Sequence, residues 1–193
     1  MNIRYLTDHR YPVTCYKKDS VVYRAGGKPG FVYFIKSGKV KMVTTNSDGD
    51  EFIQGIFQSG DHFGEPALIL NKVYLADTVV MEPTELIRVS RADFMNFVKL
   101  DKEFAVSLIE VLSTRLFYKS MMLEEIANER AEHRLLTVLN YLMEPLKSGD
   151  QLAITRKQLG DMTGLRVETV IRTLKLLAGK EQFMLSGTKI YKR

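Results

Sequence analysis

Residues 152–177 read LAITRKQLGDMTGLRVETVIRTLKLL and contain two helical patterns separated by a glycine. Thr155 precedes Gln158 by three residues, the spacing of a capping box, so a short helix is predicted to begin just after Thr155. Gly164 suits a tight turn, and a longer helix is predicted over 166–177. Apolar residues fall on the inward faces of the two helices, at Leu159, Met162, Val170, Leu174 and Leu177. Short helix, glycine turn and longer helix together form a helix-turn-helix unit.

The second helix of such a unit enters the major groove of DNA, where residues near its N-terminus and on its outer face reach base edges. The residues in those places are Arg166, Val167, Glu168, Thr169 and Arg172. An arginine pairs with two guanine acceptors and a glutamate accepts from cytosine, so Arg172 and Glu168 are the predicted base readers. Their i, i+4 spacing also suits an ordinary surface ion pair. The predicted phosphate contacts are Thr155, Arg156, Lys157, Thr169 and Lys175.

The C-terminal end of the chain is basic. Residues 146–193 hold ten Lys and Arg against four Asp and Glu, a net charge of +6, whereas 101–145 carry −3 and the 193-residue chain carries +5. This asymmetry favours contact with a polyanion, although a solvated basic surface would look the same. The last twelve residues, QFMLSGTKIYKR at 182–193, predict a two-stranded wing that turns at Ser186-Gly187. We therefore expect a winged helix-turn-helix domain over 131–193.

A long helix is predicted over 101–130, which contains neither Gly nor Pro. Two stripes of apolar residues run along this helix. The first comprises Ile109, Leu112, Leu116, Leu123 and Ile126, and the second Phe104, Leu108, Val111, Tyr118 and Met122. A helix with two apolar stripes must bury two faces. The first stripe is heptad-like and suits pairing with a second copy, so the helix is a predicted dimerisation element. Burial of both stripes in a monomeric core is the alternative. A hinge is expected near 128–131, and a further helix over 133–146.

The first hundred residues are typical of an antiparallel sandwich, jelly roll or barrel. Short runs rich in β-branched and aromatic residues lie at 21–23, 31–35, 39–45, 51–57, 77–81 and 85–90. Turn signals separate these runs, and the strongest is Asp48-Gly49, which favours a hairpin. The chain is thus predicted to be an α+β protein with a sensor domain at 1–100, the long helix at 101–130 and the winged helix at 131–193.

Composition excludes several classes of protein. The single Cys15 excludes an intramolecular disulfide framework, a cysteine-rich zinc site and a four-cysteine iron–sulfur cluster. No apolar run approaches the roughly 20 residues of a membrane-spanning helix, and the N-terminus lacks a secretion signal, so a cytoplasmic location is expected. His9, His62 and His133 are isolated, and we expect no cofactor, no metal and no enzyme activity. The alternatives are a cupin-like metalloenzyme or small-molecule-binding barrel without DNA binding, and a ligand-dependent interaction module.

The sequence resembles the Crp/Fnr family of bacterial transcription regulators over nearly its whole length. ITRKQLGDMTGLRVETVIRTLKLL at 154–177 resembles the DNA-reading signature of that family. VYFIKSGKVKM at 32–42 and SGDHFGEPALI at 59–69 resemble its cyclic-nucleotide-binding β-roll. The resemblance implies a sensor roll, a dimerisation helix and a C-terminal winged helix. It also implies a homodimer that binds a palindromic promoter site and contacts RNA polymerase.

The sequence departs from the cyclic-AMP-responsive members in one respect that bears on the ligand. In those members a Gly-Glu turn holds the ribose and a later arginine neutralises the phosphate. Gly64-Glu65 is present, but the segment NKVYLADTVV at 71–80 holds no arginine. A buried phosphate without a guanidinium partner is costly, so cyclic AMP is not expected as the effector. The candidate residues of an effector pocket are Phe63, Gly64, Glu65, Ala67, Tyr74 and Lys119. Val167 replaces an arginine common in the DNA-reading signature, so a different recognised sequence is expected.

Overall fold

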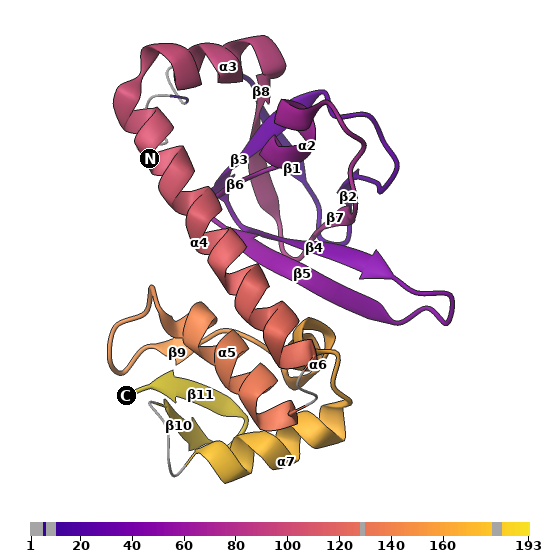
Figure 1. Cartoon of the computed structure of the whole chain (residues 1–193), viewed down its shortest axis with the longest axis vertical. Helices are drawn as coiled ribbons and strands as arrows, with labels where there is room; N and C mark the ends of the chain where they lie inside the picture. Colours follow the sequence, from indigo (N-terminus) through magenta and orange to yellow (C-terminus); the bar gives the residue numbers. More distant parts are fainter. Residues whose placement is uncertain (1–5, 7–10, 128–129, 179–182) are drawn as a thin grey trace. The chain divides into compact units, whose positions relative to one another are not determined.

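The computed structural model describes residues 6, 11–127, 130–178 and 183–193. The chain divides into two compact units, Met1–Glu110 and Val111–Arg193. Figure 1 shows antiparallel strands in the first unit and mostly helices in the second. No helix among the described residues combines the length and the apolar character that crossing a membrane requires.

The N-terminal unit contains two four-stranded antiparallel sheets. Their strands are β1 (Val13–Tyr16), β2 (Val21–Tyr23), β3 (Phe31–Ser37), β4 (Lys39–Thr45), β5 (Glu51–Gln58), β6 (His62–Phe63), β7 (Asp77–Val80) and β8 (Thr84–Ser90). One sheet has the order β1-β8-β3-β6 and the other the order β2-β7-β4-β5. The six predicted strand runs are confirmed to within a few residues. β1 and β6 were not predicted, and the two residues of β6 are too few to carry a periodic signal.

Apolar side chains from the two sheets form the core of this unit. The central cluster comprises Tyr33, Ile35, Val40, Phe63, Val80 and Leu86, all buried. The β4–β5 hairpin extends beyond this core and turns at Gly49, whose φ of 86° favours glycine. The side chain of Asn46 accepts hydrogen bonds from the backbone N–H of Asp48 and Asp50, at 3.0 and 2.8 Å, and closes the turn. The predicted hairpin at Asp48-Gly49 is therefore confirmed.

Two helices of this unit follow strands directly. α2 (Glu65–Leu70) is a short helix entered from Gly64, whose φ is 91°. α3 (Arg91–Leu100) begins at Ser90, whose hydroxyl accepts a hydrogen bond from the Asp93 N–H at 3.2 Å. Phe94 on α3 is fully buried. Neither helix was assigned by the sequence, which showed only a change of period after Arg91.

The long helix α4 (Lys102–Ala127) runs from the first unit into the second (Figure 1). Its second apolar stripe is buried: Phe104, Leu108, Tyr118 and Met122 are each no more than 9 % exposed. Its first stripe is exposed, with Ile109, Leu116 and Leu123 between 64 % and 69 % exposed. The prediction of two distinct apolar faces is confirmed. The predicted hinge begins at 128–129, which lie outside the described residues.

Beyond the C-terminal part of α4, the C-terminal unit is built from three helices and a small sheet. The helices are α5 (Ala131–Met143), α6 (Arg156–Thr163) and α7 (Val167–Leu177). The sheet has the order β10-β11-β9 and contains β9 (Gln151–Leu152), β10 (Phe183–Ser186) and β11 (Lys189–Lys192). Its core holds Leu135, Val138, Leu139, Leu159, Met162, Val170, Leu174, Leu177, Phe183 and Ile190.

Most predicted features of the C-terminal unit are confirmed. The inward residues of α6 and α7 are buried as expected, and the wing hairpin turns at Gly187. Three boundaries differ. α5 begins at Ala131 instead of 133 and ends at Met143 instead of 146. α7 begins at Val167 because Arg166 has an extended backbone and acts as the N-cap. The wing also has a third strand, β9, whose Leu152 pairs with Ile190.

Candidate nucleic-acid interface and effector pocket

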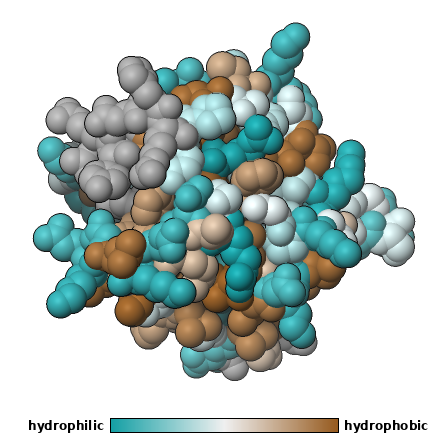
Figure 2. All heavy atoms as spheres, turned by 90° about the horizontal axis from the view of Figure 1, so that it is seen from above, coloured by the Kyte–Doolittle hydropathy of each residue, from teal (hydrophilic) through white to brown (hydrophobic). Residues whose placement is uncertain are grey.

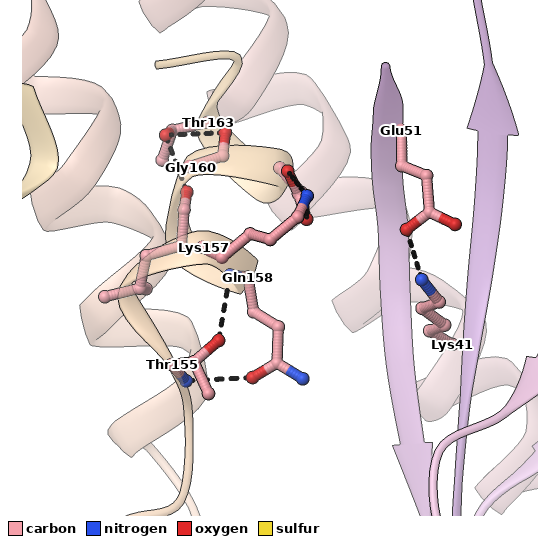
Figure 3. A network of polar contacts seen from close by, with 9 residues as sticks. Lys41, Glu51, Thr155, Lys157, Gln158, Gly160 and Thr163 are labelled. Carbon is pink, nitrogen blue, oxygen red and sulfur yellow. Dashed lines mark hydrogen bonds and ion pairs between the residues drawn. The ribbon is translucent and has the colours of Figure 1, made fainter. Parts of the chain in front are cut away.

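The start of α6 is fixed by the predicted capping box. The Thr155 hydroxyl accepts a hydrogen bond from the Gln158 N–H at 3.1 Å, and the Thr155 N–H donates to the Gln158 side-chain oxygen at 2.8 Å (Figure 3). Each bond satisfies a backbone or side-chain group that a helix terminus would otherwise leave unpaired. The hydroxyl proton of Thr155 can still be donated to a phosphate oxygen, because the cap uses the hydroxyl only as an acceptor.

The turn between α6 and α7 depends on two glycines. Gly164 ends α6 with a φ of 68° and donates its N–H to the Gly160 carbonyl oxygen. Gly160 lies inside α6, where an added Cβ would come within 2.7 Å of the Leu165 carbonyl oxygen. The close approach of the two helices therefore requires glycine at position 160. Gly164 was predicted from the sequence and Gly160 was not, since a glycine inside a helix has no distinctive pattern of its own.

A further contact from α5 holds the same turn. Arg134 donates from Nη1 to the Thr163 carbonyl oxygen at 3.2 Å, which satisfies an otherwise unpaired carbonyl at the end of α6. The Thr163 hydroxyl donates to the Leu159 carbonyl oxygen at 2.7 Å (Figure 3). Neither residue was predicted, because Arg134 lies 29 residues from its partner and only the fold brings them together.

The outer face of α7 carries most of the predicted base readers. Arg166, Glu168 and Arg172 are exposed, whereas Val167 and Thr169 are half-buried. Within the described residues no ion pair joins Glu168 to Arg172, although they are four residues apart on one helix. Both side chains are therefore available to an external partner. Lys175, a predicted phosphate contact, is also exposed, and Ile171 on the same face was not predicted.

The two basic residues at the start of α6 differ in their surroundings. Lys157 forms an ion pair with Asp161, with its Nζ 3.0 and 3.1 Å from the two carboxylate oxygens. Arg156 is half-buried, and desolvation lowers its pKa from the usual value. A phosphate that binds Lys157 must therefore displace Asp161 or share the ammonium with it. A phosphate that binds Arg156 must reach a half-buried guanidinium. The i, i+4 spacing of Lys157 and Asp161 is a sequence signal for this ion pair, whereas no pattern in the sequence marked the partial burial of Arg156.

The wing is tied to α5 by a basic residue. The Lys192 ammonium donates to the carbonyl oxygens of Leu146 at 2.7 Å and Met143 at 2.9 Å, which lie at and beyond the end of α5. A cation at this end is also favoured by the helix dipole. Part of the basic charge in residues 146–193 therefore has a structural role.

Aromatic rings pack around the candidate effector residues of the roll. Tyr74 stacks on Tyr23 with ring centroids 3.6 Å apart, and Tyr33 stacks on Phe63 at 5.2 Å. The place of a Cβ on Gly64 would lie 3.6 Å from the Tyr33 ring and 3.8 Å from the Tyr23 ring. The rings therefore lie directly against the Gly64 turn. Burial raises the pKa of Tyr74 to about 12 and raises the pKa values of Tyr23 and Tyr33.

Glu65, the carboxylate of the Gly-Glu turn, is fully buried. Its Oε1 lies 3.4 Å from Nδ1 of His62, which is also buried. Phe63 is buried with them, and Ala67 is half-buried on α2. The structure thus brings together five of the six candidates in the N-terminal unit. Lys119, the sixth, is exposed on α4 within the C-terminal unit.

The placement of possible metal-ligand side chains gives little support to a cupin-like site. No group of three or more His, Cys, Asp and Glu side chains converges in the part of the chain that the structure describes. Figure 2 shows one face of the molecule, on which hydrophobic residues lie among hydrophilic ones, in keeping with the many exposed apolar side chains.

Each compact unit matches a known family model in part. The cyclic nucleotide-binding domain matches residues 13–101. The Firmicute plasmid replication protein RepL matches residues 95–189. The boundary between the two matches falls near the start of α4.

Curated relatives match nearly the whole chain. The cAMP-activated global transcriptional regulator CRP of Pasteurella multocida is 29% identical over 185 residues, which cover 93% of this chain and 85% of the relative. The cyclic AMP receptor protein of Thermus thermophilus is 28% identical over 84% of this chain and 75% of its own length. The structure of FixK2 from Bradyrhizobium japonicum has a TM-score of 0.78 at 24% identity, covers 95% of this chain and 92% of its own, and shows the shared fold. The match to the cyclic nucleotide-binding domain and the relatives that align with nearly the whole chain together support a Crp/Fnr-type transcription regulator.

Proposed function

We propose that this protein is a DNA-binding transcription regulator that binds a palindromic promoter site as a homodimer. One observation carries the proposal: a capped α6 and a glycine-dependent turn present the exposed Arg166 at the N-cap of α7 and the exposed Glu168 and Arg172 on one face of that helix. This is the geometry with which a recognition helix enters the major groove. A helix whose outer face only contacts water does not require a capped neighbouring helix and a close glycine turn to position it.

The residues proposed to contact DNA fall into two groups. Arg166, Val167, Glu168, Thr169 and Arg172 lie on the first two turns of α7 and contact base edges. Thr155, Arg156, Lys157 and Lys175 contact phosphates, together with Thr169, and set the orientation of the domain. Lys157 exchanges its bond with Asp161 for a phosphate, or shares it.

The dimer is proposed to form along the first apolar stripe of α4. Leu116 and Leu123 are seven residues apart and are 67 % and 69 % exposed, so a monomer would leave a large apolar seam in water. Pairing of two such helices buries the seam in the manner of a coiled coil. Two-fold symmetry then places two α7 helices in successive major grooves, about 34–36 Å apart.

The roll is proposed to modulate DNA binding without cyclic AMP. Relatives carry names that include cyclic AMP, but position 74 holds a tyrosine whose ring is stacked on Tyr23. A cyclic phosphate placed against Tyr74 would meet a neutral phenol, since burial favours the protonated form. An effector of another class remains compatible with Phe63, Gly64, Glu65, Ala67, Tyr74 and Lys119. The dimer on DNA is proposed to act in the cytoplasm by contact with RNA polymerase.

Selection of sites from random duplex DNA tests the proposal. Rounds of selection with the full chain are expected to yield a palindrome whose half-sites are one helical turn apart. Specific affinity should exceed non-specific affinity by about 10³-fold or more, and both should fall with salt. Failure to enrich any sequence, with binding that depends on salt alone, would contradict the proposed function.

A further inference from the structure

A pocket of about 740 Å³ lies in the C-terminal unit between α4, α5 and β11. Small-molecule sites in proteins occupy about 300–1,000 Å³, so this volume suits a ligand of small-molecule size. The pocket is lined mainly by α4 and α5, with Phe117, Tyr118 and Met121 on the first helix and Asn140 and Tyr141 on the second. All the residues of α4 and α5 that line the pocket belong to one compact unit, Val111–Arg193 (Figure 1).

The pocket faces away from the seam proposed for dimerisation. An α-helix has 3.6 residues per turn, so Phe117 lies about 100° and Met121 about 140° around α4 from Leu116. Leu116 and Leu123 define the seam, within about 20° of each other by the same geometry. Pairing along the seam therefore leaves the Phe117 face to another partner. Phe117 is 69 % exposed, as much as Leu116, and the dimer does not account for it.

The walls of the pocket are aromatic. Tyr118 and Tyr141 stack on each other with ring centroids 3.9 Å apart and planes 15° apart, so they form a rigid wall of two parallel rings. Phe117 and Met121 extend this apolar surface along α4. Rings and a thioether bind the face or the edge of another aromatic ring with specific geometry.

The polar groups of the pocket select against anions. Lys192 is its basic residue, and the Lys192 ammonium already donates to three backbone carbonyl oxygens, those of Met143, Glu144 and Leu146. Glu144 adds a carboxylate at the rim. The remaining polar side chains include Thr137 and Asn140, which can exchange hydrogen bonds with a neutral ligand.

We propose that this pocket binds an uncharged planar aromatic molecule of one or two rings. One face of the ligand lies against Phe117 and Met121, and its polar edge meets the Asn140 amide and the Thr137 hydroxyl. None of the residues that line the pocket belongs to the roll or to the proposed DNA contacts. The existence of the site does not depend on the proposed DNA sequence or on the dimer.

Calorimetric titration of the full chain with 2-naphthol, indole and adenine tests the site. At least one of these neutral rings is expected to bind saturably, with a dissociation constant below about 1 mM. Phe117→Ser and Met121→Ser remove exposed side chains of the wall and should each weaken binding about tenfold or more. The matched control is Val106→Ser, which removes a 55 % exposed side chain from the same helix outside the pocket and should change affinity less than about twofold.

Three results would overturn the inference. The first is the absence of saturable binding by any of the three compounds. The second is equal affinity of wild type and Phe117→Ser for the ligand. The third is a loss of affinity in Val106→Ser as large as that in Phe117→Ser. Circular dichroism of each variant checks that the helices are intact. Benzoate serves as an anionic comparison and should bind more weakly than the neutral rings, because the pocket has no uncommitted cation.

Discussion

The Tyr74 ring lies flat against the Tyr23 ring, with centroids 3.6 Å apart and planes 8° apart. Backbone hydrogen bonds hold the residue at both ends: Tyr74 donates its N–H to the Gly27 carbonyl oxygen at 3.0 Å, and Gly26 donates to the Tyr74 carbonyl oxygen at 2.8 Å. The Tyr74 hydroxyl also lies 3.4 Å from the Phe31 carbonyl oxygen, to which it donates. Tyr74 therefore joins three segments of the roll and is part of its packing.

Alkaline pH should destabilise the roll partly through Tyr74. Burial raises the pKa of Tyr74 from 10.0 to about 12, so the folded state favours the neutral phenol. The corresponding stability is fully present below pH 10 and is lost as the pH rises towards 12. Urea unfolding across this range should show a steeper loss for wild type than for Tyr74→Phe. Parallel pH profiles for the two proteins would contradict this assignment.

Cyclic AMP should not stabilise the protein against heat. A ligand that binds only the folded state stabilises it by about 2.7 kcal/mol at 100 times its dissociation constant. Because no arginine lies between Asn71 and Val80 and Tyr74 is stacked on Tyr23, we expect no shift in melting temperature with millimolar cyclic AMP. A saturable upward shift that disappears in Glu65→Ala would show that the roll binds the nucleotide after all.

Charged residues in the seam of α4 should produce monomers. Leu116→Lys with Leu123→Lys places two ammonium groups where two copies are proposed to meet, and their desolvation opposes pairing. Sedimentation equilibrium should show a dimer for wild type and a monomer for the double variant, with much weaker binding to a palindromic site. Leu176→Lys is the control, since Leu176 is 50 % exposed on α7 outside the seam. A wild-type monomer at micromolar concentration would rule out the proposed interface.

Arg172 and Lys157 should contribute to DNA binding in different ways. Arg172→Ala is expected to cost about 1–3 kcal/mol on the selected site and to relax discrimination at one base pair per half-site. Lys157→Ala should weaken binding to all sequences similarly and reduce the salt dependence, because a phosphate contact releases counterions. Competition against single-base variants at two salt concentrations distinguishes them. Equal loss across all variants for Arg172→Ala would make Arg172 a backbone contact.

Lys157 should also respond to the loss of its partner. Asp161→Ala removes the carboxylate that holds the Lys157 ammonium. Lys157 then no longer has to give up an ion pair with Asp161 when it binds a DNA phosphate. Binding to non-specific DNA should strengthen, and the slope of affinity against salt should steepen. The double variant Lys157→Ala, Asp161→Ala is the control. If it binds as tightly as Asp161→Ala alone, Lys157 does not contact phosphate.

Gly160→Ala should disrupt the turn of the helix-turn-helix unit. The added Cβ would lie 2.7 Å from the Leu165 carbonyl oxygen, so the backbone of the turn must shift. Overpacking of this kind costs about 1–3 kcal/mol, more than the helix propensity that alanine adds. The melting temperature and the affinity for DNA should both decrease. Gly30→Ala is the control, because a Cβ there meets nothing within 4 Å, and it should leave both values nearly unchanged.

Local patterns determined much of this protein. The capping box at Thr155, the turn at Gly164 and the two stripes of α4 follow from spacings of three to seven residues, and the structure has them as predicted. Such features depend on hydrogen bonds and burial within one or two helical turns, which a single sequence displays directly. The strands of the roll follow in the same way from runs of β-branched and aromatic residues.

Only the tertiary structure decided which polar and aromatic groups meet. Arg134 and Thr163 are 29 residues apart, and Tyr74 and Phe31 are 43 apart, yet each pair is joined by a hydrogen bond. The pocket beside Phe117 likewise needs α4, α5 and β11 together. No periodicity encodes these distances, because the order of the strands and the packing of the helices set them. The sequence by itself thus determined most of the elements and the helix-turn-helix unit, and the packing of those elements decided which side chains fill the roll and which basic residues bind other groups of the protein.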